Sequence, residues 1–211
     1  MSHQPGPPTA RGRATYERIV QAAAALIYEQ GVAHTSLDDV RAATSTSKSQ
    51  LYHYFTDKSD LVCAVIEWQT HAVLTGQEPF LSEFSTLVEL RAWSDHLVGV
   101  NADLLSYRGC PIGGPASAVA PDDVRAREVS AAAFEAWRAK LASGLQRIVD
   151  KGELGADVDP DTLSLGLLAA VQGGLLLAQV AQDVRPLAVA LDHALAAVEA
   201  GAVAPFSRSG R

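Results

Sequence analysis

The sequence predicts an all-α protein of about nine helices, in which an N-terminal three-helix domain with a helix-turn-helix precedes a larger helical domain. Apolar residues recur at three- and four-residue steps along most of the chain, which is the spacing of one helix face. Two short capped segments meet at a tight turn within residues 36–54, which is the helix-turn-helix pattern. The 211 residues, 48% hydrophobic and 19% charged, suit a folded globular chain.

The first helix is predicted over about residues 15–30, after a flexible arm at residues 1–12. Thr15 is a suitable N-cap, and Gly31 is placed to end the helix. The arm is rich in proline, glycine and serine and carries Arg11, with Arg13 directly after it, so it either approaches phosphates or is a solvated tail. The helix carries one apolar stripe, formed by Ile19, Ala23, Leu26 and Ile27.

Two short helices follow the first. Ser36 is predicted to cap the first of them, which runs to about Ala43, because the acidic residue Asp39 follows three positions later, as in a capping box. After the turn Thr44-Ser45-Thr46, Ser47 is predicted to cap a helix over residues 48–54. Asp57 then caps a fourth helix, whose expected buried face is Leu61, Val65, Trp68 and Ala72.

Three stretches of this region follow a known pattern. They are Thr35-Ser36-Leu37-Asp38-Asp39-Val40, Ser47-Lys48-Ser49-Gln50-Leu51-Tyr52-His53-Tyr54-Phe55 and Asp57-Lys58-Ser59-Asp60-Leu61. Over about residues 13–63 the chain resembles the DNA-binding domain of TetR-family repressors, which implies a domain at 13–58 that binds double-stranded operator DNA. One departure is Ser45-Thr46, where the family usually has Gly-Val. A left-handed residue other than glycine costs about 1 kcal/mol there, which packing can absorb.

The second short helix is expected to enter the major groove. Leu51 and Phe55, four residues apart, face inward and leave the other side chains free. Lys48 suits guanine O6 and N7, and Gln50 suits adenine N6 and N7 as the main specificity reader. Tyr54 either contacts phosphate or packs. The predicted DNA-binding residues are Thr35, Ser36, Thr46, Ser47, Lys48, Ser49, Gln50, Tyr52, His53 and Lys58.

The net charge of −7 is unevenly distributed. Residues 1–58 carry six basic and five acidic side chains, a net charge of +1, whereas the remainder carries −8. A nucleic-acid partner is therefore expected at the N-terminal part only. Because the basic bias is small, hydroxyls and helix ends must share the phosphate contacts.

A ligand-binding and dimerisation domain is predicted at residues 59–204, followed by a C-terminal tail at 205–211. Its first long helix spans about 84–106, with Leu87, Leu90 and Leu97 on its stripe. Gly109 ends that helix, a short helical piece lies near 116–119, and Pro121 is placed to start the next helix. That helix carries a stripe through Leu145 and Ile148 and stops at Gly152, and Asp159-Pro160-Asp161 opens another.

Residues 163–181 are apolar almost all round. We do not expect a membrane span, because Ser164, Gln172 and Gln179 interrupt the run and no basic cluster flanks it. A helix of this kind in a folded protein is buried on every side. Together with a last helix at 187–200 it is predicted to meet its copy in a homodimer, with Gly173-Gly174 allowing close approach of the backbones.

The second domain also contains several stretches of a known pattern. They are Arg108-Gly109-Cys110-Pro111-Ile112-Gly113, Phe134-Glu135-Ala136-Trp137, Gly152-Glu153-Leu154, Asp157-Val158-Asp159-Pro160 and Gln172-Gly173-Gly174. Over about residues 84–199 the chain resembles one branch of the same family, the regulators similar to LmrA and YxaF. This resemblance implies a repressor of efflux or modifying-enzyme genes that releases DNA on binding a drug-like or aromatic molecule. After Gly113 the chain departs from the branch with Gly114-Pro115-Ala116, so the pocket wall and the ligand are expected to differ.

A small-molecule inducer needs an apolar pocket with a few polar groups. The residues predicted to line it are Trp93, His96, Val100, Leu104, Cys110, Phe134, Trp137, Leu141, Leu168, Gln172 and Leu176. Ordinary core packing remains the alternative for the aromatic members, and a bond across the dimer for Gln172. Ligand is expected to shift the fourth helix, so that two recognition helices about 35 Å apart no longer match successive major grooves.

The sequence does not predict an enzyme, a metal site or a cofactor. The two cysteines, Cys63 and Cys110, suit a reducing cytoplasm. Nothing near Cys110 supplies a general base, so an enzyme that uses it as a thiol nucleophile is the weaker alternative. A DNA-binding regulator with no small-molecule ligand is the other.

Overall fold

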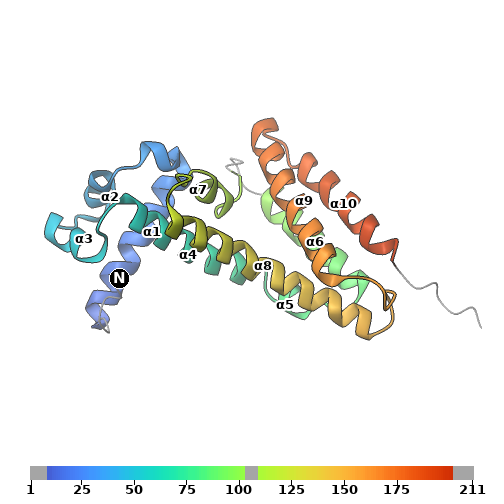
Figure 1. The fold of residues 1–211 in the computed structure, drawn as a ribbon. Coiled ribbons are helices and arrows are strands. Elements are labelled where there is room, and N and C mark those ends of the chain that lie inside the picture. Colours follow the sequence, from blue (N-terminus) through green and yellow to red (C-terminus); the bar gives the residue numbers. More distant parts are fainter. Residues whose placement is uncertain (1–8, 103–108, 202–211) are drawn as a thin grey trace, which may run out of the picture. The chain divides into compact units, whose positions relative to one another are not determined.

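The computed structural model describes residues 9–102 and 109–201, and in these residues all regular secondary structure is helical (Figure 1). Ten helices, α1 to α10, fall in the described part, against about nine predicted, and the all-α class is confirmed. They form two compact units: the first contains residues up to Val73 and Cys110–Ala133, and the second contains Leu74–Gly109 and the residues from Phe134 onward.

The first unit is built on α1 (Ala10–His34), α2 (Leu37–Thr44) and α3 (Lys48–Tyr54). The first part of α4 (Lys58–Gly76), α7 (Gly113–Ser117) and the first part of α8 (Val124–Asp150) complete it. Its core is mainly aliphatic, and Phe55 is the one aromatic side chain among its buried members in the described residues. These buried members include Ile19, Val20, Ala23, Val40, Leu51, Leu61, Cys63, Val65, Ile66, Ile112 and Ala126.

The first helix begins earlier than predicted. Its N-cap is Thr9, whose hydroxyl accepts from the Gly12 N–H, so residues 10–12 of the expected arm are helical. Thr15 lies inside the helix, where its hydroxyl donates to the Arg11 carbonyl. Gly31 interrupts the helix with φ of 83°, a conformation that favours glycine. Residues 1–8 and the expected tail at 205–211 lie outside the described residues.

The turn between α2 and α3 is held by side chains. Ser45 is in the left-handed region, with φ of 51° and ψ of 32°. Arg18 of α1 donates to the Thr44 carbonyl at the end of α2, and the Thr46 hydroxyl donates to the Thr44 hydroxyl at 2.7 Å. These bonds explain how the turn keeps its conformation without the glycine that the resemblance led us to expect.

The second unit contains α5 (Phe80–Glu83), α6 (Leu87–Ala102), the later part of α8, α9 (Pro160–Ala181) and α10 (Arg185–Glu199). The helix predicted over 84–106 is α6 and begins three residues later, at Leu87, after a turn at Phe84, whose ring packs on the backbone of Gly144; residues 103–106 lie outside the described residues. The helix after Pro121 begins three residues later than predicted, at Val124, with the Asp123 carboxylate accepting from the Ala126 N–H. Gly152 and Asp159 do end α8 and cap α9, as predicted.

Helix α9 has two different faces. One packs in the unit, with Leu167, Val171 and Gly174 buried, and α10 runs beside it (Figure 1). A Cβ atom on Gly174 would lie 2.8 Å from the Leu187 Cα, so this glycine permits close approach of α10 in the same chain. The other face, which includes Leu165, Leu176 and Val180, is exposed in the single chain. The prediction that a copy of the chain covers it therefore stays a prediction.

Candidate functional site

Helix α3 is fixed at its N-terminus by a capping box. The Ser47 hydroxyl accepts from the Gln50 N–H, and the Gln50 carboxamide oxygen accepts from the Ser47 N–H, both at 3.2 Å. Leu51 and Phe55 are buried, as predicted, and anchor the helix to the core. The rest of α3 presents a continuous polar surface, because Lys48, Ser49, Gln50, Tyr52 and His53 are all exposed.

Two aromatic side chains of α3 behave differently. Tyr52 is 48% exposed, and the Lys48 ammonium lies 5.8 Å from its ring centroid, which sets the two side chains together one turn apart. Tyr54 instead packs, since its hydroxyl donates to the Gly12 carbonyl at 3.1 Å and its ring meets the Tyr16 ring edge-on. Of the two possibilities left open for Tyr54, phosphate contact or packing, the structure shows packing, which joins α3 to the start of α1.

The predicted phosphate-binding hydroxyls fall into two groups. Ser36 and Ser47 are exposed caps, and the Ser36 hydroxyl also donates to the Asp39 carboxylate. Thr35 and Thr46 are buried, at 2% and 4% exposure, with their hydroxyls donating to the Gly31 carbonyl and the Thr44 hydroxyl. Their side chains are therefore part of the packing, and we remove them from the candidate surface. Lys58 is half-buried and reaches the Ala33 carbonyl at 3.4 Å.

A polar network that sequence reasoning missed joins the first turns of α4 and α8 within the first unit. Asp60 accepts from Thr56 and from the Arg125 guanidinium, and Ser59 donates to Asp123. Burial alone would raise the pKa of Asp60, but the bonds from Thr56 and Arg125 outweigh it and lower the pKa. The partners are 65 residues apart, so no local pattern could have indicated the pairing.

The fourth helix buries more of its start and less of its end than predicted. Residues Leu61 to Ile66 are buried, whereas Trp68 is half-buried and Ala72 is exposed. Burial also raises the pKa of the Cys63 thiol, which keeps it protonated and unreactive.

Several ligand candidates of the second unit already have partners. Trp93 is fully buried, and its indole N–H donates to the Gln77 side-chain oxygen at 2.9 Å. His96 is half-buried, stacks on Phe80 with centroids 4.6 Å apart, and has a ring nitrogen 3.3 Å from the Gly76 carbonyl. Both residues are accounted for by the fold, so neither by itself indicates a ligand.

Trp137 and Gln172 are the exceptions. The indole Nε1 of Trp137 and the amide Nε2 of Gln172 are buried donors with no hydrogen-bond acceptor among residues 9–102 and 109–201. Trp137 is 1% exposed, on the part of α8 that belongs to the second unit, and Gln172 lies on α9. An unpaired buried donor costs about 1–3 kcal/mol, so an acceptor brought to either atom would be favourable.

The remaining ligand candidates divide by position. Leu141 and Leu168 are buried in the second unit, and Phe134 is half-buried there. The prediction that Val100 and Leu176 line the pocket is corrected, because their side chains are 47% and 60% exposed and lie on the surface of the described fold. Cys110 is buried in the first unit, and Leu104 lies outside the described residues.

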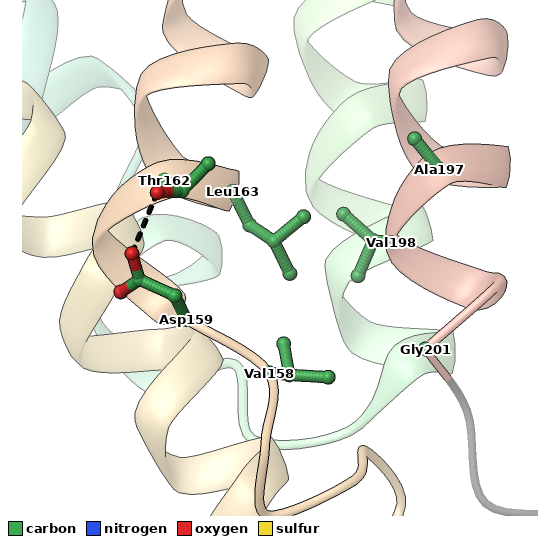
Figure 2. A pocket seen from close by; sticks show the side chains of 7 residues that line it. All are labelled: Val158, Asp159, Thr162, Leu163, Ala197, Val198 and Gly201. Atoms are coloured by element: carbon green, nitrogen blue, oxygen red, sulfur yellow. Dashed lines mark hydrogen bonds between the residues drawn. The ribbon is translucent and has the colours of Figure 1, made fainter.

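A surface cavity in the second unit lies between the start of α9 and the end of α10. Figure 2 shows Val158, Leu163 and Val198 pointing toward one another across it, beside the Asp159 carboxylate and the Thr162 hydroxyl that bond at 2.6 Å. Its volume is about 260 Å³. None of the predicted ligand residues lines it, so it does not support the predicted pocket.

A capped helix that presents a polar face and is braced by buried Leu51 and Phe55 against a helical core defines a helix-turn-helix DNA-binding protein. A second helical unit in the same chain is the organisation of a one-component transcription regulator. Two family models match the chain: "Bacterial regulatory proteins, tetR family" over residues 19–65, and "Tetracyclin repressor-like, C-terminal domain" over residues 86–194. The chain belongs to the TetR family of transcriptional regulators.

Known relatives agree with this assignment. An uncharacterised HTH-type transcriptional regulator from Lactococcus lactis is 32% identical over 83% of this chain and 88% of its own length. The regulator YxaF from Bacillus subtilis is 25% identical over 85% of this chain and 92% of its own, which confirms the branch resemblance. Among solved structures, the SmeT–triclosan complex has a TM-score of 0.69 and 25% identity, covering 94% of this chain and 98% of that one.

Proposed function

We propose that this regulator represses transcription by binding double-stranded operator DNA as a homodimer, and that a small apolar or aromatic molecule releases it. The observation that carries the proposal is the exposed polar surface of α3, backed by buried Leu51 and Phe55. Base edges are read by a few side chains of a helix held rigidly in register. The proposed DNA contacts are Ser36, Ser47, Lys48, Ser49, Gln50, Tyr52 and His53, with Lys58 at the edge.

The exposed face of α9 supports dimerisation. Leu165, Leu176, Leu177 and Val180 are 59% to 77% exposed in the single chain. Gly166, Ala169 and Gly173 lie on the same face, and a Cβ at either glycine would meet nothing within 4 Å. An apolar surface with small residues at its centre suits a two-fold contact between identical helices. Helix α9 is also the one helix of the described residues long and apolar enough to cross a membrane, and we propose that a copy of the chain covers it.

The two unpaired donors support a ligand. A molecule with a hydrogen-bond acceptor would satisfy Trp137 Nε1 or Gln172 Nε2 and offset the cost of burying them. The neighbour SmeT was solved with triclosan and is described as the repressor of a multidrug efflux pump. By analogy we propose control of efflux or detoxification genes by a cytoplasmic regulator.

The test combines operator selection with ligand release. Protein incubated with random DNA pools should enrich a two-fold symmetric site, and a panel of apolar aromatic compounds should raise the melting temperature and reduce the affinity for that site. The variant Trp137→Phe removes the unpaired N–H, so it should keep operator binding and weaken the response to compounds with acceptors. If no compound stabilises the wild type, the alternative of a DNA-binding regulator without a ligand is favoured.

A further inference from the structure

Gln50 is held to Ser47 by two hydrogen bonds of opposite direction. Its backbone N–H donates to the Ser47 hydroxyl, and its side-chain oxygen accepts from the Ser47 N–H. A backbone N–H can only donate, so the carboxamide atom that faces it is the oxygen. This fixes the orientation of the amide and leaves Nε2, with its two N–H bonds, as the free end of an exposed side chain.

The same device occurs one helix earlier. In α2 the Ser36 N–H donates to the Asp39 carboxylate at 2.8 Å, while the Asp39 N–H donates to the Ser36 hydroxyl. There an acid, which can only accept, fills the position that Gln50 fills in α3. The cap therefore requires an acceptor at this position, and the glutamine adds a donor that the cap does not use.

Reading adenine with both ends of a glutamine needs the oxygen to accept from N6 and Nε2 to donate to N7. A glutamine whose oxygen stays in the cap has no acceptor left for N6. Guanine presents two acceptors, O6 and N7, side by side in the major groove, whereas adenine presents N7 beside the N6 donor, so an amide end that can only donate is better matched to guanine.

We propose that Gln50 reads the operator with the capping box intact, as a hydrogen-bond donor only, and that it selects guanine rather than adenine. This rests on the proposed function of α3 as the DNA-reading helix. It replaces the adenine preference that the residue type alone predicts. Gln50 is then a specificity-determining residue whose preference is set by Ser47.

Three variants of the full-length protein test the assignment. Gln50→Glu keeps the acceptor for the cap and removes the donor, Gln50→Ala removes both, and Gln21→Glu adds the same charge at an exposed position of α1. Each is used for selection from random DNA pools, and its melting temperature is measured. Operators containing 7-deazaguanine, which lacks the N7 acceptor, are then compared with guanine at the assigned position.

The expected result is a guanine in each half-site that wild type and Gln21→Glu prefer by about tenfold and Gln50→Ala does not. Gln50→Glu should melt at the wild-type temperature and prefer cytosine at that position, because a carboxylate accepts from cytosine N4. Replacing N7 should weaken wild-type binding about fivefold and leave Gln50→Ala unchanged. An adenine preference that depends on Gln50, or an unchanged base preference in Gln50→Ala, would overturn the inference. Absence of any selected site for the wild type would instead refute the proposed function.

Discussion

At the residue scale, the turn between α2 and α3 depends on Ser45 adopting a conformation that glycine prefers. The resemblance drew attention to this position, and a strain of about 1 kcal/mol was expected there. What the sequence could not indicate is the compensation. Arg18 comes from α1, and the Thr44–Thr46 hydroxyl pair forms only once the turn is closed. Compensation of this kind is a tertiary property, so local propensity does not predict it.

Ser45→Val should destabilise the protein by about 1–2 kcal/mol, because a β-branched residue is strained at positive φ. Ser45→Gly should change stability by less than about 1 kcal/mol, since relief of strain and added chain entropy oppose one another. Urea unfolding measures both. Ser49→Val, at an exposed position with ordinary helical geometry, is the control and should cost no more than about 0.5 kcal/mol. Equal losses for the two valine variants would show that the turn is not strained.

Asp60 gives a prediction about pH. Its pKa is lowered in the folded protein, so its charged form contributes stability above the unfolded pKa of about 3.9, and the contribution is lost as pH falls through the lower folded value. Asp60→Asn should therefore cost about 1–2 kcal/mol at neutral pH and progressively less below about pH 4. Denaturant melts at several pH values measure the difference. Asp38→Asn, on an exposed ion pair, should show little effect at any pH.

At the scale of elements, periodicity and capping residues predicted most of the helices. Ser36, Ser47, Asp57 and Asp159 cap where they were expected to, because a cap acts within three residues and is visible in the sequence. The late starts of α6 and α8 depend on contacts with distant residues, which no local pattern records. The early start of α1 is different, because its cap at Thr9 acts on Gly12 and is local.

A substitution of Gly144 tests the packing of Phe84 in the turn between α5 and α6. A Cβ at this position would lie 1.9 Å from the Phe84 ring, which is buried, so the ring cannot stay in place. Gly144→Ala should destabilise the protein by about 1–3 kcal/mol through overpacking, despite the better helix propensity of alanine. Gly99→Ala, in α6 with nothing within 4 Å, is the matched control and should stabilise by about 0.5–1 kcal/mol. Thermal unfolding of both variants decides, and a stabilised Gly144→Ala would contradict the packing.

At the scale of the whole molecule, an almost entirely apolar helix predicts that α9 is covered, but it does not distinguish cover by the same chain from cover by a copy. The structure shows which residues the same chain covers, since Gly174 meets α10 while Gly173 faces outward and is left for the proposed dimer contact. The candidate DNA surface was largely predictable, because it is continuous in sequence. The ligand residues were less so, because they come from several helices and because Val100 and Leu176 face the surface.

If α9 forms the proposed dimer contact, Leu176→Glu should give a monomer, because a charge buried in an apolar contact is not compensated. Sedimentation velocity measures the mass, and operator affinity should fall at least tenfold because both half-sites are no longer bound together. Val88→Glu places the same charge at a residue 79% exposed on α6 and should leave the mass unchanged. A Leu176→Glu protein that remains dimeric would exclude this face as the contact.

The capping box of α3 also limits how this regulator can diverge. Position 50 supplies an acceptor to the Ser47 N–H and, in the proposed complex, also faces the groove, so most single substitutions there should alter helix stability and base preference at once. Glutamate and a few other polar residues keep the cap, and the remainder weaken it. Duplicated copies of the gene should therefore acquire new target sites mainly through substitutions of Lys48 and Ser49, whose side chains do not supply the acceptor of the capping box. The residue at position 50 should be substituted less often.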